Sequence, residues 1–182
     1  KLQAISMKQG LKYTKRLARI DVKRNNRVKD YMRKTARSII HLCMEQKIGI
    51  LVVGYNKDFK RSINLGKKTN QQFTQIPFGL LREYLYNLCE YYGIEYVEQE
   101  ESYTSKASFF DQDELPTWKP EKEEYAFSGK RICRGLYQTG KGFIVNADVN
   151  GALNILRKSN LIDITILQGK GCLAHPQRVR IV

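Results

Sequence analysis

The residues best suited to do chemistry lie in two short acidic stretches. Asp148 is the single carboxylate in the run Val-Asn-Ala-Asp-Val-Asn-Gly-Ala-Leu-Asn-Ile, residues 145–155. Glu100 and Glu101 directly precede Ser-Tyr-Thr-Ser-Lys, residues 102–106. Cleavage of a phosphodiester by divalent ions needs several carboxylates, which hold two ions about 3.5–4 Å apart. Mg²⁺ suits such a site because it prefers oxygen ligands. These three residues are therefore the candidate catalytic residues.

Each stretch also has a structural alternative. Asp148 at the start of a helix could be a cap, because a carboxylate there accepts from unpaired N–H groups and meets the positive end of the helix dipole. Capping would need Asp148 alone and not the whole dense run, so we interpret the run as a metal-ligand helix. Residues 98–101 could be a solvated acidic turn. Thr104 and Ser105 could cap a turn, or could hydrogen-bond a phosphate or a nearby carboxylate.

The hydrophobic pattern predicts the elements that position these residues. Residues from about 8 to 46 contain no Pro, and no Gly after Gly10, and predict one long basic helix or two with a break near Asn25-Asn26. The apolar run 48–55 predicts a buried strand. Pro77 and Gly93 bracket a helix over 78–92, and a second strand over 94–99 follows. Residues 100–143 are interpreted as an irregular insertion, and 148–158 as the ligand-bearing helix. This order indicates an α/β layer fold.

The composition favours a polyanionic partner. The 182 residues carry a net charge of +14, and phosphate-backbone binding is the commonest reason for such an excess. A basic face that only keeps the protein soluble is the alternative. The four Cys form no CxxC pair, Cys43 and Cys89 fit core positions, and this usage suits a reducing cytosol. No apolar run approaches the roughly 20 residues that span a bilayer.

Three elements, in order, resemble the transposon-encoded TnpB (OrfB) family. Residues 146–155 are similar to its last catalytic motif, and Tyr103-Thr104-Ser105 to its Tyr-Thr-Ser element. Lys29-Asp30-Tyr31, followed by Arg37 and Ile39-Ile40, resembles its helix before the central strand. The resemblance runs from about residue 11 to 158. It implies a RuvC-like, RNase H-type domain of an insertion-sequence, RNA-guided DNA endonuclease, related to type V CRISPR nucleases. Two Mg²⁺ ions, DNA, a guide RNA and a prokaryotic, nucleoid-associated cytoplasmic location are implied with it.

One departure from the family concerns the glutamate at the end of the central strand. Gly54 stands where the family usually has this catalytic Glu, and Gly cannot bind a metal. A carboxylate relocated to the adjacent strand end would replace it, as in a known branch of the family. Because strand side chains alternate between faces, only one of Glu100 and Glu101 should point at the site, and Glu101 is preferred. Asp148 and Glu101 are thus the expected metal ligands.

A second departure concerns the four-Cys zinc element of the family. Ser108 and Asp111 stand near the places of its first Cys pair, and Cys133 is isolated, so zinc is not expected. The insertion is instead predicted to fold around four aromatic residues: Trp118, Tyr125, Phe127 and Tyr137. The candidate nucleic-acid-binding residues come from the loop after the first strand, from the Thr-Ser element and from this insertion: Lys60, Arg61, Lys67, Lys68, Thr104, Ser105, Lys106, Lys130, Arg131 and Arg134.

A third departure concerns the first catalytic Asp, which the family carries on an early strand. No matching strand occurs here, so it is expected upstream of Lys1. The predicted organisation is a partial nuclease domain over 1–99, an insertion over 100–145 that binds the target nucleic acid, and a final helix with a basic tail over 146–182. Such a fragment is expected to cleave poorly alone. The competing hypothesis is a catalytically inactive nucleic-acid-binding module that regulates transposon or host transcription; a ribosome-associated basic protein would leave the Asp148 run unexplained.

Overall fold

The chain folds into two units. The computed structural model describes residues 2–10, 13–56, 77–118, 124–163, 167, 176 and 179–181. One unit comprises Lys1–Gly49, Asn64–Ile94 and Ile181–Val182, and the other comprises Ile50–Ile63 and Glu95–Arg180. Helices build the first unit, whereas two small sheets and a helix build the second. The predicted mixture of helices and strands is confirmed, and the predicted division at residues 99 and 145 stays a prediction.

The first unit is built around one long helix. α1 (Leu2–Lys8) is separate from α2 (Lys15–Glu45), with Gly10 at a φ of +70° in between. The predicted start near residue 8 was therefore wrong. α2 begins where the Thr14 hydroxyl accepts a hydrogen bond from the N–H of Leu17 at 3.3 Å. It continues through Asn25-Asn26, so the alternative of two helices is excluded.

The C-terminal half of α2 packs on α5 (Phe78–Tyr92). The buried residues of α2 in this half are Met32, Ala36, Ile40 and Cys43, which recur at helical spacing and so share one face. α5 buries Leu85 and Cys89. Cys43 and Cys89 are buried, which confirms them as core residues, and burial raises the pKa of both thiols. The predicted bounds of α5 are also confirmed, because Pro77 precedes it and Gly93 ends it at a φ of +69°.

The second unit contains a parallel strand pair. β1 (Ile50–Tyr55) pairs with β2 (Glu95–Glu100), and Gly54 lies opposite Gln99. Both strands begin later than predicted. Residues 51–55 are half-buried, so the predicted full burial of β1 was wrong: of the described strands, only β2 pairs with it. The parallel register brings the ends of both strands to one edge, and this edge carries Glu100 and Glu101.

An antiparallel sheet replaces the predicted irregular insertion. β3 (Lys130–Cys133), β4 (Leu136–Gln138) and β5 (Ile144–Asn146) pair in the order β3-β4-β5. Tyr137 is buried at its centre with Val145 and Ala147. Burial, reinforced by the charges of Asp113 and Asp111, raises the pKa of Tyr137 to about 12. Its hydroxyl therefore stays protonated, and it donates to the carbonyl of Lys106 at 2.7 Å.

The predicted aromatic centre of the insertion was right for Tyr137 and wrong for Trp118. The Trp118 side chain is 59% exposed. Tyr125 and Phe127 are half-buried and pack against Tyr103, with ring centroids at 5.0 and 6.2 Å. Of the four predicted aromatic residues, only Tyr137 is therefore part of the buried core.

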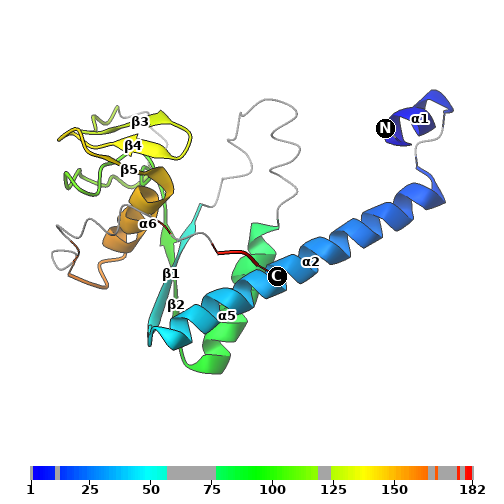
Figure 1. The fold of residues 1–182 in the computed structure, drawn as a ribbon, viewed down its shortest axis with the longest axis horizontal. Coiled ribbons are helices and arrows are strands. Elements are labelled where there is room, and N and C mark those ends of the chain that lie inside the picture. The colour runs from blue at the N-terminus through cyan, green and yellow to red at the C-terminus, as the bar shows by residue number, and fades with distance from the viewer. Residues whose placement is uncertain are drawn as a thin grey trace. The chain divides into compact units, whose positions relative to one another are not determined.

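α6 (Ala147–Lys158) contacts both sheets of the second unit (Figure 1). Two fully buried asparagines join it to residues 104–109. Asn150 accepts from the N–H of Phe109 at 3.0 Å and donates to the carbonyl of Ala107 at 2.8 Å. Asn154 donates to the carbonyls of Thr104 and Ala107. The asparagines of the 145–155 run therefore hold the chain together around Asp148.

Replacing Asn150 by Leu should destabilise the protein. The substitution removes both hydrogen bonds and leaves a buried N–H and a buried carbonyl without that partner, at a cost of about 2–4 kcal/mol. Chemical denaturation measures this loss. Ala152→Ser, an exposed change on the same helix, is the control and should shift stability by less than about 0.5 kcal/mol. Equal stability of the two variants would contradict the proposed joining role.

Candidate functional site

A single cleft in the second unit brings the two candidate metal ligands together. It measures about 1030 Å³. Asp148 and Glu101 both line it, although 47 positions separate them in the sequence. α6 carries Asp148, and Glu101 directly follows the end of β2. Most of the remaining lining residues come from the turn after β2, from the segment before residue 119 and from α6, and Asn56 and Arg131 complete the lining.

Asp148 is not the cap of α6. Asn146 takes this position, and its side-chain oxygen accepts from the N–H groups of Asp148 and Val149 at 2.9 and 3.0 Å. The capping alternative for Asp148 was therefore wrong, because the cap is already supplied. Asp148 lies in the first turn, where the helix dipole favours a negative charge. Its side chain is 88% exposed, and its nearest recorded cation is Arg131 at 4.0 Å.

Glu101 occupies the space that a side chain at residue 54 would need. The backbone N–H of Glu101 donates to the carbonyl of Tyr55 at 3.2 Å, which extends the strand pairing by one residue. A Cβ built on Gly54 would lie 2.5 Å from Glu101 Oε2. It would also lie 2.8 Å from Ile155 Cδ1, a flexible side-chain end that can move. A side chain at residue 54 would therefore require the Glu101 carboxylate to leave its present position.

Glu100 is committed to a structural ion pair. Lys158 Nζ lies 2.5 Å from Glu100 Oε2, and the N–H of Ser102 donates to Glu100 Oε1 at 2.6 Å. Burial alone would raise the pKa of Glu100, but the hydrogen bonds from Lys158 and Ser102 outweigh it and hold the pKa below its ordinary value. Lys158 also donates to the carbonyls of Ser102 and Pro116. The ion pair disfavours Glu100 as a catalytic residue.

The predicted nucleic-acid-binding residues divide by exposure. Lys60, Arg61, Lys67 and Lys68 lie outside the described residues. Thr104 is buried, and its hydroxyl donates to the carbonyl of Glu101 at 2.8 Å. The structure therefore favours the turn-capping alternative for Thr104 over a phosphate contact. The exposed members are Ser105, Lys106, Lys130, Arg131 and Arg134, of which Ser105, Lys106 and Arg131 line the cleft.

Hydrogen bonds hold the region where the family has its zinc element. The Ser108 hydroxyl donates to Asp111 at 2.5 Å, and the N–H of Gly140 donates to the same Asp111 oxygen at 2.6 Å. Asp113 accepts from the N–H of Ser108, and from both the N–H and the hydroxyl of Ser128. Two carboxylates thus tie residues 108–113 to the sheet region through hydrogen bonds. In the described ranges, no group of three or more His, Cys, Asp or Glu could hold a metal ion.

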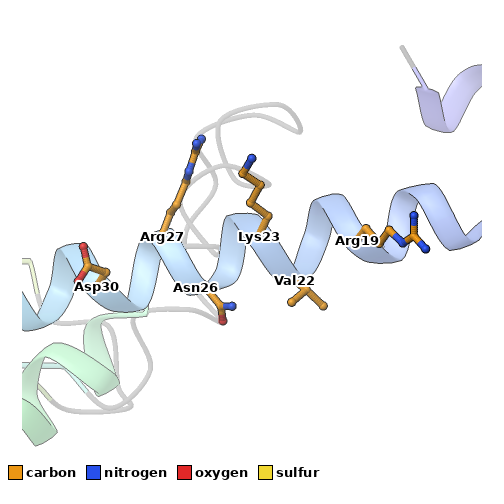
Figure 2. A pocket seen from close by; sticks show the side chains of 6 residues that line it. All are labelled: Arg19, Val22, Lys23, Asn26, Arg27 and Asp30. Carbon is orange, nitrogen blue, oxygen red and sulfur yellow. The ribbon is translucent and has the colours of Figure 1, made fainter.

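The N-terminal half of α2 presents a basic surface in the first unit. Arg19, Lys23 and Arg27 line a shallow pocket there together with Val22, Asn26 and Asp30. Lys23 and Arg27, one turn apart, project from the same side of the helix (Figure 2). Such a row of cations along a helix suits a phosphate backbone.

Sequence reasoning missed Asn146, Asp113 and Lys158. Asn146 could have been recognised, because Asn is among the preferred residues at a helix N-cap. Lys158 carried only the weak signal of a basic residue in the last turn of a helix.

Glu100→Gln should lower stability in a pH-dependent way. The pKa of Glu100 is lowered in the folded protein, so its contribution is present above the unfolded pKa of about 4.3 and is lost as the pH falls through the folded value. The Tm difference between wild type and variant should be full at pH 7 and shrink towards pH 3. A difference that grows on acidification would contradict the ion pair.

Two protein-family models match parts of the chain. A family model described as "Probable transposase" (OrfB, IS605) matches residues 1–60, and one described as "Cas12f1-like, TNB domain" matches residues 78–155. No significant match was found among curated protein sequences. No helix in the described residues is long and apolar enough to cross a membrane.

A solved structure shares the fold. It is described as the cryo-EM structure of a Cas12f1–sgRNA–target DNA complex, and it aligns with a TM-score of 0.54 at 18% identity over 88% of this chain. The chain covers 39% of the length of that protein. The transposase match and the TNB-domain match confirm the resemblance to the TnpB family that was drawn from the sequence.

Proposed function

We propose that this chain is the nuclease portion of a transposon-associated, RNA-guided DNA endonuclease with a RuvC-like, RNase H-type site. One observation carries the proposal: Asp148 and Glu101 line one cleft, and the Glu101 carboxylate lies against Gly54, where the family has its glutamate. The structural neighbour is a complex with a guide RNA and target DNA, which supports RNA and DNA as partners. In this scheme base pairing reads the sequence, and the protein holds the backbone.

The donor set of the cleft fits Mg²⁺. Asp148 and Glu101 offer carboxylate oxygens, the ligands that Mg²⁺ prefers. The chemistry that bound Mg²⁺ supplies is activation of the attacking water and stabilisation of the leaving oxygen. Arg131 and Lys106, on the wall of the cleft, attract the phosphate and orient it towards the carboxylates. Two carboxylates are fewer than a two-ion site needs, so we propose that the early-strand aspartate of the family completes it.

Asp148→Asn and Glu101→Gln should each weaken metal binding. Even residues that only orient metal ligands contribute about 10- to 100-fold to affinity, so loss of a ligand should cost at least about tenfold. Mn²⁺ binding followed by electron paramagnetic resonance gives this value without any cleavage. Glu114→Gln, at an exposed carboxylate outside the cleft residues, is the matched control and should leave Mn²⁺ affinity unchanged.

A carboxylate swap tests the relocation of the glutamate. Glu101→Gly should lose Mn²⁺ binding, and the double variant Gly54→Glu/Glu101→Gly should regain part of it, because removal of the Glu101 side chain frees the space that a Cβ at residue 54 needs. Gly54→Glu alone should not improve binding, since the two side chains collide. If the double variant binds no better than Glu101→Gly, the relocation fails.

Charge removal from α2 tests its part in nucleic-acid binding. For the double variant Lys23→Gln/Arg27→Gln we expect weaker binding at every duplex sequence and a salt slope reduced by about 1.8, since each phosphate contact contributes about 0.9. Fluorescence anisotropy between 50 and 200 mM salt measures the slope. Lys141→Gln, exposed and outside both α2 and the cleft, is the control. An unchanged slope in the double variant would remove α2 from the interface.

A binding module without cleavage is the second candidate function. It is favoured by the ion pair between Glu100 and Lys158, which leaves Asp148 and Glu101 as the remaining carboxylates that line the cleft. The discriminating experiment supplies the chain with guide RNA, Mg²⁺ and a plasmid that carries the guide's target, beside a form extended upstream. Cleavage by either form that Asp148→Asn abolishes supports the nuclease. Tight RNA binding without cleavage in both forms supports the module.

A further inference from the structure

Trp118 is exposed at the candidate nuclease cleft. It is the only Trp of the chain, its side chain is 59% exposed, and it lines the same cleft as Asp148 and Glu101. A large aromatic side chain is usually largely buried, because it gains more than most side chains from leaving water. An exposed indole in a cleft that also carries charged side chains therefore favours a ligand with a flat apolar face.

The segment that carries Trp118 is anchored. Arg157 donates to the carbonyl of Asp113, and Lys158 donates to the carbonyl of Pro116 at 3.1 Å. The second anchor lies two residues before Trp118, and both come from the end of α6. The backbone that approaches Trp118 is thus fixed to the helix that carries Asp148. A ligand would pay little ordering entropy to meet the ring.

The charges around Trp118 select the kind of ligand. Lys106 and Arg131 line the same cleft and are exposed, and Lys106 lies 5.9 Å from the centre of the Tyr103 ring. Cations for a backbone, together with an aromatic face for a flat ring, are the two features of proteins that bind single-stranded nucleic acid. A base inside a duplex has both faces covered by its neighbours, so the ring needs an unpaired base.

We propose that Trp118 forms a nucleobase-stacking subsite that holds single-stranded DNA beside the candidate nuclease site, with Lys106 and Arg131 on its phosphates. The stacking follows from the cleft itself, whereas the identity of the strand as DNA rests on the proposed function. The subsite would keep one base out of a helix, so that the adjacent phosphate can lie in the cleft with Asp148 and Glu101.

The single Trp makes the subsite directly observable. The full chain, in EDTA so that no cleavage occurs, is titrated with a single-stranded DNA oligonucleotide and with an abasic oligonucleotide of the same length. We expect a solvent-exposed emission spectrum in the free protein and quenching by the base-bearing strand alone. Equal quenching by the abasic strand, or a buried-indole spectrum in the free protein, would overturn the proposal. Stronger quenching by single-stranded RNA of the same sequence would reject DNA as the strand.

Substitutions of Trp118 test its contribution to the affinity for single-stranded DNA. Trp118→Ala should weaken single-stranded DNA binding about 5- to 100-fold, and Trp118→Phe should retain most of it, because Phe still stacks. Phe143→Ala is the matched control, since Phe143 is 66% exposed but lies outside the cleft residues. Circular dichroism confirms folding, which Trp118→Phe preserves if Trp118→Ala does not. Unchanged affinity in Trp118→Ala would overturn the subsite.

These experiments distinguish a failure of the stacking subsite from a failure of the nuclease proposal. Base-dependent quenching, with no form of the protein able to cleave, keeps the subsite and rejects the nuclease. Asp148-dependent cleavage with base-independent quenching keeps the nuclease and rejects the subsite.

Discussion

The ammonium group of Lys158 joins three separate segments around the candidate site. It binds Glu100 at the end of β2, the carbonyl of Ser102 in the following turn and the carbonyl of Pro116. Lys158 is itself at the end of α6, and its side chain is 10% exposed. An ammonium with three donors needs three acceptors when it leaves water. The demand for these acceptors fixes β2, the turn and the Trp118 segment against one helix.

The same arrangement separates the two neighbouring glutamates, although both line the cleft. Strand side chains alternate between faces, so once Lys158 holds Glu100, Glu101 lies on the other side of the chain, next to Gly54. The lack of a side chain at residue 54 is then part of the site, because any Cβ would displace the carboxylate. In the relocation that we propose, the carboxylate reaches this place from the second of two paired strands, and the first strand leaves the space open.

Local patterns predicted the elements that depend on local causes. Pro77 and Gly93 bounded α5, and the apolar run before Asn56 gave β1, because caps and hydrophobic runs are properties of neighbouring residues. β3, β4 and β5 were missed, since three or four residues with polar members such as Lys130 and Arg131 show no period. The partners of Lys158 lie 42 to 58 positions away. No local signal marks them.

The same difference between local signals and distant partners applies to the candidate site. Asp148 and Glu101 were predicted from a motif and from strand alternation, and the structure places both on one cleft. The role of the surrounding asparagines was not predicted, because their partners, Thr104, Ala107 and Phe109, are distant in the sequence. Trp118 was expected in a core because of its residue type. Its segment is held by hydrogen bonds to the carbonyls of Asp113 and Pro116, whose donors are distant in the sequence.

The carboxylates of the second unit differ in the number of hydrogen-bond donors that they accept from. Glu100, Asp111 and Asp113 each accept two or more hydrogen bonds from the protein, and such a carboxylate has few lone pairs left for an ion. Asp148 differs, because Asn146 takes the N–H groups at the start of α6 that a carboxylate there could have used. The capping asparagine thereby keeps Asp148 turned to the solvent of the cleft. Substitution of Asn146 would let Asp148 compete for those N–H groups, so the cap governs the chemistry of the neighbouring carboxylate as well as the stability of the helix.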